Sequence, residues 1–537
     1  MPEAKVERPP FFKSVRNYFR EYCNCTSIHG FRYFGEKRTY FERGWWFIVF
    51  TVTLVACIIS IREVYKKWLR APVIVSFATK ETPIYSIPFP AVTICPETKS
   101  TQSLYSHMGI VRKFLNKQNL TERERTVVDY MGLVCEENRH IKYSDTEVFT
   151  DDFYKVLEEI SHGTDPFYRC EYMGTPYDCH KIFKPVVTDE GLCYTFNMLD
   201  RSEIFQNNIY HYGDYFKVDR LTRNNWTMAK GYTESAGLYP YPRRALHSGA
   251  KNALSVSLIM AKKNLDHSCK QSLQGFRVSL HIPSRIPRPS QEYFRVPLNE
   301  VVLAAIRPEM ITTDSSVQLY NPYKRECFFP TEKKLKYFKL YTGRNCALEC
   351  LTNYTLYHCG CVNYFMPREN TTNICGIESL NCMRNAELRY ELGELRSKMS
   401  KTSTNSNSTR RQRYRKTIKL NCDCMPMCSD LTYNVETSQS YWEWAETLKA
   451  ETKNGTILYG VDNHYVSKLI LFFKSSQFIT SERHELYGPT DFLANFGGLL
   501  GLFTGFSILS LMEAIYFLTV RLCCNSRLYG YWAGPEK

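Results

Sequence analysis

Hydrophobic residues are concentrated in two long stretches, one toward each end of the chain. The first covers Gly44–Ile61 (GWWFIVFTVTLVACIISI) and contains no charged side chain. The second covers Phe492–Val520, which is longer and in which Glu513 is the one charged side chain. A bilayer core about 30 Å thick is crossed by about 20 helical residues. The pattern therefore predicts two transmembrane helices, over residues 44–64 and 489–520.

A buried core helix is the alternative for the first stretch, because its length lies at the short end of membrane spans. Trp45 and Trp46 at one end, with Tyr65 and Trp68 beyond the other, are typical of membrane interfaces and favour a span. The first 43 residues carry nine Lys/Arg and five Asp/Glu, too many charges for the apolar region of a cleavable signal peptide. We therefore expect the first stretch to act as a signal anchor.

The segment between the two stretches mixes strand-like and helix-like patterns. β-Branched runs bounded by proline predict strands at Ile87–Cys95 and Phe276–Pro283. Leucines recur on one side of Glu387–Met399, which predicts an exposed helix. The Ser/Thr/Asn- and Arg-rich segment 401–416 predicts a linker. The expected fold class is therefore α+β.

Basic residues are equally dense on the two sides of the first stretch, so flanking charge does not indicate which side of the membrane faces the cytosol. Cysteine usage provides that evidence instead. Sixteen of the 21 cysteines lie between the stretches, which favours an oxidising exterior and a disulfide framework. Zinc is the alternative, but no complete and well-spaced quartet of Cys and His is present. We expect a two-span plasma-membrane protein with a cytosolic N-terminus (1–43), an extracellular Cys-rich domain (65–488) and a cytosolic C-terminus (521–537).

Composition and sequons change this picture little. With 44% hydrophobic and 23% charged residues the chain is not a disordered one, and its net charge of +15 is spread along the sequence, so nucleic-acid binding is not expected. Sequons of the form N-x-[ST] agree with an exterior domain, although chance alone would give about four. The candidate glycosylation sites are Asn119, Asn225, Asn353, Asn370, Asn407 and Asn454.

The second apolar stretch carries features that a passive anchor does not need. Gly497, Gly501 and Gly505 follow small-xxx-small spacing, for which helix association in lipid is one explanation. The stretch is also longer than the bilayer requires, so the helix tilts or breaks. Gly505-Phe506-Ser507 is the natural break, where backbone carbonyls and a hydroxyl can replace the hydration shell of an ion. Glu513, repeated around an axis, would form an acidic ring that attracts cations, unless it snorkels to water at the inner interface.

Several motifs, in order across nearly the whole chain, carry a family resemblance. They are Ser27–Gly30 with its His-Gly pair, Phe89–Cys95, Gly191–Asn197, the Cys-rich end Cys422–Cys428, and G-x-S at Gly505–Ser507. The sequence resembles subunits of the degenerin/epithelial sodium channel family, most closely the insect pickpocket branch. The resemblance implies a trimer of identical or related subunits, and an ectodomain shaped like a clenched hand with palm, β-ball, finger, thumb and knuckle.

The resemblance also implies roles for individual residues. Gly505-Phe506-Ser507 would form the selectivity filter, at a break in the pore-lining second helix. His29 and Gly30 would lie on a re-entrant cytosolic segment and take part in gating, as would Ala494 near the outer end of the second span. The family conducts Na⁺ in preference to K⁺ and is commonly blocked by amiloride. No cofactor or metal is expected beyond the permeant Na⁺.

The family pattern further implies a set of disulfides. Cys135 and Cys269 are left over and pair only by exclusion. The other implied pairs are Cys95–Cys193, Cys170–Cys179, Cys327–Cys428, Cys346–Cys424, Cys350–Cys422, Cys359–Cys382 and Cys361–Cys375.

The leading hypothesis is a Na⁺-selective channel subunit gated by an extracellular stimulus that the sequence does not identify. A two-span scavenger-receptor-like protein that binds lipids is the alternative, but it needs neither Glu513 nor a glycine break at Gly505. An ectoenzyme is not expected, because neither H-E-x-x-H nor G-x-S-x-G occurs outside the apolar stretches. Channels gated by extracellular ATP share the two-span topology but not this cysteine pattern.

Overall fold

A computed structural model of the chain shows two compact units. It describes residues 10–70, 73–102, 105–135, 145–161, 165–218, 224–402, 422–451, 463–486 and 488–534. The first unit, here the helical unit, takes its residues from Met1–Val75, Ser315–Tyr320 and His484–Lys537; the second, here the disulfide-rich domain, from Ser76–Asp314 and Asn321–Arg483. Asn407, Asn454 and most of the predicted linker lie outside the described residues.

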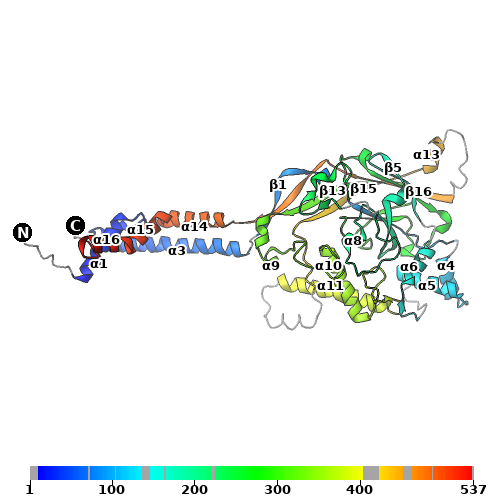
Figure 1. Ribbon diagram of the computed structural model, residues 1–537, viewed down its shortest axis with the longest axis horizontal. Helices are drawn as coiled ribbons and strands as arrows, with labels where there is room; N and C mark the ends of the chain where they lie inside the picture. Colours follow the sequence, from blue (N-terminus) through cyan, green and yellow to red (C-terminus); the bar gives the residue numbers. More distant parts are fainter. Residues whose placement is uncertain are drawn as a thin grey trace, which may run out of the picture. The chain divides into compact units, whose positions relative to one another are not determined.

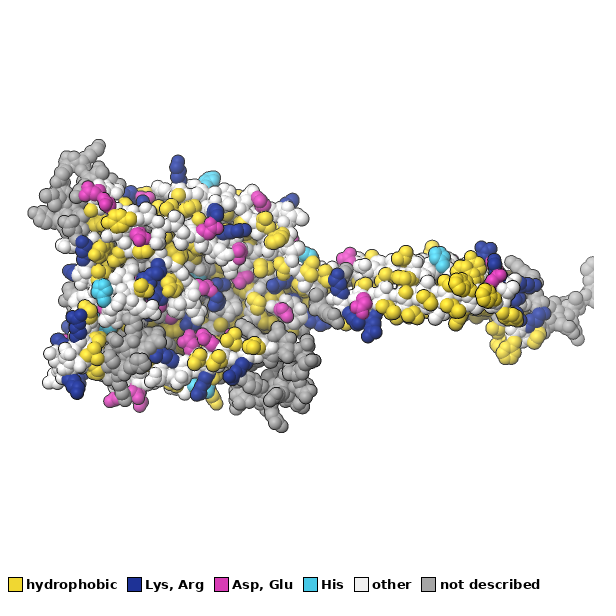
Figure 2. Space-filling view, turned by 180° about the vertical axis from the view of Figure 1, so that it is seen from behind, with side chains coloured by type: hydrophobic (Ala, Val, Ile, Leu, Met, Phe, Trp, Pro, Cys, Tyr) yellow, Lys and Arg dark blue, Asp and Glu magenta, His cyan; other side chains and the backbone are white. Residues whose placement is uncertain are grey.

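Two antiparallel arms of helix make up the helical unit (Figure 1). One arm is α3 (Tyr40–Arg70), which begins before and ends after the predicted 44–64. Its apolar centre is exposed, and hydrophobic side chains cover much of the visible surface of this unit while charged ones gather toward its two ends (Figure 2). Tyr40–Leu69 is long and apolar enough to cross a membrane, as is Ile508–Tyr529 in the other arm. The other helices of the unit are α1 (Phe11–Cys25), α2 (Arg32–Gly35), α14 (Pro489–Thr504), α15 (Ile508–Leu518) and α16 (Val520–Tyr529).

The second predicted span, 489–520, is divided between three helices. Helix α14 ends at Thr504, α15 starts at Ile508, and α16 continues to Tyr529, beyond the predicted end at Val520. Helix α14 packs along α3, where the Trp68 and Phe492 rings lie 5.4 Å apart and the thiol of Cys57 contacts the carbonyl of Leu499 at 3.9 Å. The interruption between α14 and α15 is where glycine and serine were expected to break the helix.

The disulfide-rich domain is built on two sheets, which confirms the α+β class. An eight-stranded mixed sheet has the order β1-β17-β13-β16-β10-β4-β5, with β15 paired to β13; a five-stranded antiparallel sheet has the order β12-β11-β2-β7-β6. The strands of the first sheet are β1 (Val73–Pro83), β4 (Phe167–Tyr172), β5 (Thr175–Tyr177), β10 (Leu254–Ala261), β13 (Glu300–Thr313), β15 (Asp430–Tyr441), β16 (His464–Phe473) and β17 (Gln477–Glu485). Those of the second are β2 (Ala91–Pro96), β6 (Phe183–Thr188), β7 (Gly191–Phe196), β11 (Phe276–His281) and β12 (Phe294–Val296).

Short ladders and helices complete the domain. The short ladders pair β3 (Val148–Phe149) with β14 (Ile374–Cys375) and β8 (Trp226–Thr227) with β9 (Gly231–Tyr232). The helices are α4 (His107–Leu115), α5 (Glu122–Cys135), α6 (Asp152–Ile160), α7 (Cys179–Ile182), α8 (Arg201–Ile204), α9 (Pro322–Arg325), α10 (Gly343–Cys359), α11 (Leu380–Thr402) and α13 (Trp444–Glu451).

The predicted strands are present but shorter than the sequence suggested. The first was expected over Ile87–Cys95, yet β2 begins at Ala91. Pro88 and Pro90 have no backbone N–H to give to a ladder, which excludes this part of the run from the sheet. From Ala91 on, every residue of β2 is buried, because the strand lies at the centre of its sheet between β11 and β7. The predicted helix over Glu387–Met399 lies within α11, which extends beyond it at both ends.

Eight disulfides brace the domain: seven pair the cysteines that the family pattern implied, and the eighth joins Cys135 to Cys269, which were paired only by exclusion. The eight are Cys95–Cys193, Cys135–Cys269, Cys170–Cys179, Cys327–Cys428, Cys346–Cys424, Cys350–Cys422, Cys359–Cys382 and Cys361–Cys375. Two of them tie α10 to the segment before β15, another ties the residues after α9 to that same segment, and a fourth ties α10 to α11. With all sixteen cysteines of the domain oxidised, none is left as a thiolate ligand for zinc.

A cluster of buried charges lies beside the five-stranded sheet. Glu190 and Lys99 are 2% and 4% exposed, and Glu190 lies within 3.1 Å of Lys270 and 2.9 Å of Arg277. Arg277 also donates to Glu97 at 2.9 Å. Burial raises the pKa of Glu190, but Lys99, Lys270 and Arg277 together outweigh it and hold that pKa below its usual value. Burial lowers the pKa of Lys99 to about 8. Glu190 is therefore the carboxylate that Lys99, Lys270 and Arg277 share, and Glu97 is a second partner of Arg277 alone among the three.

Glu190→Gln is expected to lower the free energy of unfolding by about 3–5 kcal/mol, because it leaves buried cations without their counter-charge. Lys99→Met removes one of those cations at similar volume and is expected to leave stability unchanged or to raise it. Thermal unfolding of the detergent-purified protein measures both. Glu309→Gln, at an exposed position on β13, is the matched control. If Glu190→Gln unfolds at the same temperature as this control, Glu190 does not hold the cluster together.

Candidate functional site

The interruption of the second apolar arm is shaped by one glycine and two hydroxyl side chains. Gly505 ends α14 with φ +68°, a left-handed conformation that favours glycine. Its amide donates to the carbonyl of Gly501 at 2.9 Å. Ser507 begins α15, where its Oγ accepts from the amide of Ser510 and the Oγ of Ser510 accepts from the amide of Ser507. Three residues, 505–507, therefore separate the end of α14 from the start of α15. Of these, Phe506 is half-buried and Ser507 is exposed.

The segment between α1 and α2 packs against this break. The amide of His29 donates to the carbonyl of Thr504 at 3.0 Å, which satisfies one of the carbonyls that the end of α14 leaves open. A Cβ atom at Gly505 would lie 2.7 Å from the His29 ring, so no other residue fits there without displacing the ring. Gly30 follows with φ +86° and turns the chain toward α2. The structure thus brings His29 against Gly505, with Gly30 next to it in the same segment.

A second set of hydrogen bonds joins the same segment to α15. The hydroxyl of Ser27 lies 2.7 Å from that of Ser510, and the amide and hydroxyl of Ser27 donate to Oε2 of Glu513 at 3.1 and 3.3 Å. Glu513 is therefore a hydrogen-bonded carboxylate, joined to the N-terminal segment of its own chain. Ser27 and Ser510 were not singled out from the sequence as site residues. The sequence signal for Ser510 is a hydroxyl within an apolar stretch, and the structure shows this hydroxyl fully buried.

Helix α1 continues this contact toward the end of α15 (Figure 1). The rings of Tyr18 and Tyr22 lie 5.9 and 5.3 Å from the ring of Phe517. Arg521 forms an ion pair with Glu21. Aromatic and ionic contacts thus attach the N-terminal helix to the helices that follow the break.

The remaining residues predicted in the second arm lie on the open surface of α14. Ala494 is exposed, so it does not pack against α3. A Cβ atom at Gly497, Gly498 or Gly501 would meet nothing within 4 Å. The small residues of α14 are therefore not used for its contact with α3. They form an uncovered strip that a neighbouring helix can approach closely.

The four candidate glycosylation sites within the described residues differ in accessibility. Asn119 and Asn370 are exposed, whereas Asn225 is half-buried. Asn353 lies on α10, half-buried, and its side-chain oxygen accepts from the hydroxyl of Tyr337 at 3.2 Å. Exposure therefore favours Asn119 and Asn370 as acceptors.

Comparison with known proteins assigns this architecture to a family. The family model for amiloride-sensitive sodium channels matches residues 22–517, which includes the break, the N-terminal segment packed on it and the disulfide-rich domain. Pickpocket protein 28 of Drosophila melanogaster is 27% identical, over 94% of this chain and 79% of its own length. Sodium channel protein Nach of the same species is 24% identical over 98% and 91%, and acid-sensing ion channel 2 of Danio rerio is 23% identical over 80% and 69%. Members of this family are ion channels of like or related subunits and not enzymes. The chain belongs to the amiloride-sensitive sodium channel family.

Proposed function

We propose that this subunit conducts Na⁺ through a constriction formed at Gly505-Phe506-Ser507. The observation that carries the proposal is the break itself: two apolar helices are interrupted by three residues that combine an exposed hydroxyl with irregular backbone. Irregular backbone at membrane depth persists where it is buried in protein or lines a water-filled path. Carbonyl and hydroxyl oxygens there can replace the water that a sodium ion loses.

Three subunits around one axis would place three such breaks at the same level. The uncovered strip of Gly497, Gly498 and Gly501 supports this, because helices with small residues approach each other closely. Glu513 lies eight residues beyond Gly505 and would add a ring of negative charge below the constriction. Partners are further copies of this chain or related subunits, together with the lipid bilayer.

Gating is proposed to involve His29, Gly30 and Ala494. His29 and Gly30 support the break from the N-terminal side, so a displacement of their segment would alter the hydrogen bond to Thr504. Ala494 is exposed near the start of α14, where the helices of neighbouring subunits would lie close together in a shut pore. A small side chain permits that approach.

The remaining properties follow from family membership and the disulfides. We place the disulfide-rich domain outside the cell and both termini in the cytosol of a plasma-membrane protein, because eight disulfides need an oxidising compartment. We expect block by amiloride and opening by an extracellular stimulus of chemical, osmotic, mechanical or acid nature. The scavenger-receptor-like alternative gives no reason for the break or for the N-terminal segment packed on it.

Substitution of Ser507 tests the proposal directly. Ser507→Ala and Ser507→Asp remove or charge an oxygen at the constriction, so both should change the Na⁺/K⁺ permeability ratio while the protein still reaches the surface. Reversal potentials in oocytes under Na⁺/K⁺ exchange, with challenges of pH, osmolarity and ligands, measure this ratio. Ser526→Ala, which removes an exposed hydroxyl from α16, is the matched control. Reversal potentials that stay at the wild-type value in both variants would contradict the proposal that Ser507 lies at the constriction.

A methyl group at Gly505 tests whether the contact with His29 holds the break in its working geometry. Gly505→Ala must bear a left-handed conformation, which costs about 1–2 kcal/mol for an L-residue. It also places a Cβ 2.7 Å from the His29 ring. We expect a large loss of current at equal surface abundance. Gly530→Ala, at the left-handed end of α16 (φ +65°), where a Cβ meets nothing within 4 Å, should keep most of the current. Equal currents in the two variants would contradict the role of this contact.

A further inference from the structure

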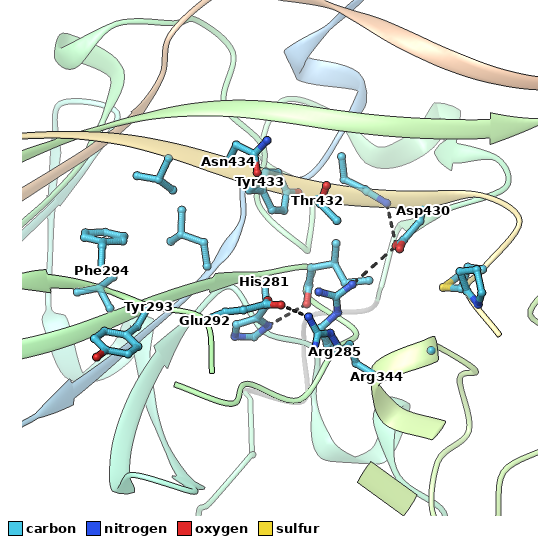
Figure 3. Close-up of a pocket in the computed structure, with 18 of the residues that line it drawn as sticks. His281, Arg285, Glu292, Tyr293, Phe294, Arg344, Asp430, Thr432, Tyr433 and Asn434 are labelled. Atoms are coloured by element: carbon cyan, nitrogen blue, oxygen red, sulfur yellow. Dashed lines mark hydrogen bonds and ion pairs between the residues drawn. The ribbon is translucent and has the colours of Figure 1, made fainter. Parts of the chain in front are cut away.

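A pocket of about 680 Å³ opens within the disulfide-rich domain, between β11, β12, β15 and the start of α10 (Figure 3). This volume lies in the range of small-molecule sites. The surrounding elements are tied together: β11 and β12 pair in one sheet, β15 belongs to the other, and the Cys346–Cys424 disulfide joins α10 to the segment before β15. The pocket is therefore formed in advance, which lowers the entropic cost of binding a ligand.

One wall of the pocket is apolar. Val278 of β11 and Leu431 of β15 are fully buried, and Leu280, Phe294 and Val435 are half-buried beside them. An aliphatic or aromatic ligand body can cover the exposed parts of Leu280, Phe294 and Val435, at about 25 cal/mol per Å² of apolar area removed from water.

Arg285 faces this wall and forms a long ion pair with Asp430 (Figure 3). Its side chain is 13% exposed, and its Nε is buried without a hydrogen-bond partner among the described residues. The nearest carboxylate is that of Asp430, whose Oδ1 lies 3.9 Å from Nη2 of Arg285, beyond hydrogen-bonding distance. Burial raises the pKa of Asp430, and the positive charge of Arg285 partly offsets this effect. The guanidinium fork of Arg285 is therefore available for a planar acceptor such as a carboxylate.

The other polar groups of the lining add no further unpaired charge, and a helix N-terminus among them favours an anion. The positive charge of Arg344 is neutralised by an ion pair with Glu292 at the half-exposed rim of the pocket. His281 contributes no charge, because burial lowers its pKa to about 4 and its Nε2 lies 2.9 Å from the hydroxyl of Thr93. The N-terminus of α10, a helix of 17 residues, lines the pocket at Gly343, and its dipole favours an anion there.

We propose that this pocket binds a small organic acid, with its carboxylate on Arg285 and its apolar body against the wall formed by β11 and β15. A ligand held in this way touches both sheets and α10 at once. The site lies within the disulfide-rich domain, so binding does not depend on the proposed conduction path.

Direct binding to the detergent-purified full chain tests the proposal without any measurement of current. The probe is 4-phenylbutyrate, titrated by calorimetry, with 4-phenylbutylamine and 4-phenylbutanol as ligands of the same body and a different head group. Saturable binding of the acid, with the amine and the alcohol clearly weaker, is expected. Absence of saturable binding up to about 10 mM, a concentration that would still reveal a weak site, overturns the proposal. Equal or tighter binding of the amine also overturns it, because Asp430 would then be the recognising group.

Two variants locate the binding. Arg285→Gln should lower the affinity for 4-phenylbutyrate by about 10- to 100-fold, as expected for the loss of hydrogen bonds to a charged group. Val435→Phe fills the pocket without a change of charge and should abolish binding, which keeps the test valid if Arg285→Gln folds poorly. Arg307→Gln and Thr437→Phe, at exposed positions on β13 and β15, are the matched controls and should bind like the wild type. Wild-type affinity in either pocket variant, at an unchanged unfolding temperature, contradicts the site.

Discussion

A broken helix in an apolar segment leaves backbone groups that must find partners within the protein, because lipid offers none. The structure meets this requirement with the chain's own N-terminal segment. His29 bonds the carbonyl of Thr504 at the end of α14, and Ser27 bonds Ser510 and Glu513 one turn into α15. The break and the N-terminal segment therefore depend on each other. The sodium path that we propose at this level would need both.

The disulfide-rich domain solves a different problem. Its strands form two sheets that are joined by long connections. Disulfides restrain these connections by linking cysteines that lie between 9 and 134 residues apart in the sequence. Each such closure restricts the unfolded chain. The bridges concentrate where α10 meets the segment before β15, so this corner is held more rigidly than sheet pairing alone would hold it. The same corner encloses the pocket with Arg285, which is why we consider that pocket to be formed in advance.

Much of this architecture could be predicted from the sequence, because it follows from local composition. Apolar length predicts the two membrane arms, and Gly505 beside Ser507 predicts the break. The predicted start of β2 was too early. Pro88 and Pro90 lack the backbone N–H that a ladder requires, and the β-branched residues of the run do not compensate for this. Ser27 was not identified as a partner of Glu513, and Glu190 was not identified as the centre of a charge cluster. Both depend on residues far apart in the chain, which no local pattern brings together.

Conduction at the break requires that Ser507 face the proposed permeation path. Cadmium block of Ser507→Cys measures this most directly, because a thiolate binds soft divalent metals and a bound ion at the constriction stops current. The account predicts that external Cd²⁺ blocks Ser507→Cys currents in a voltage-dependent manner, whereas the wild type and Leu509→Cys, at an exposed position on α15, are much less sensitive. Block of equal strength in all three, or no block of a Ser507→Cys channel that conducts normally, would contradict it.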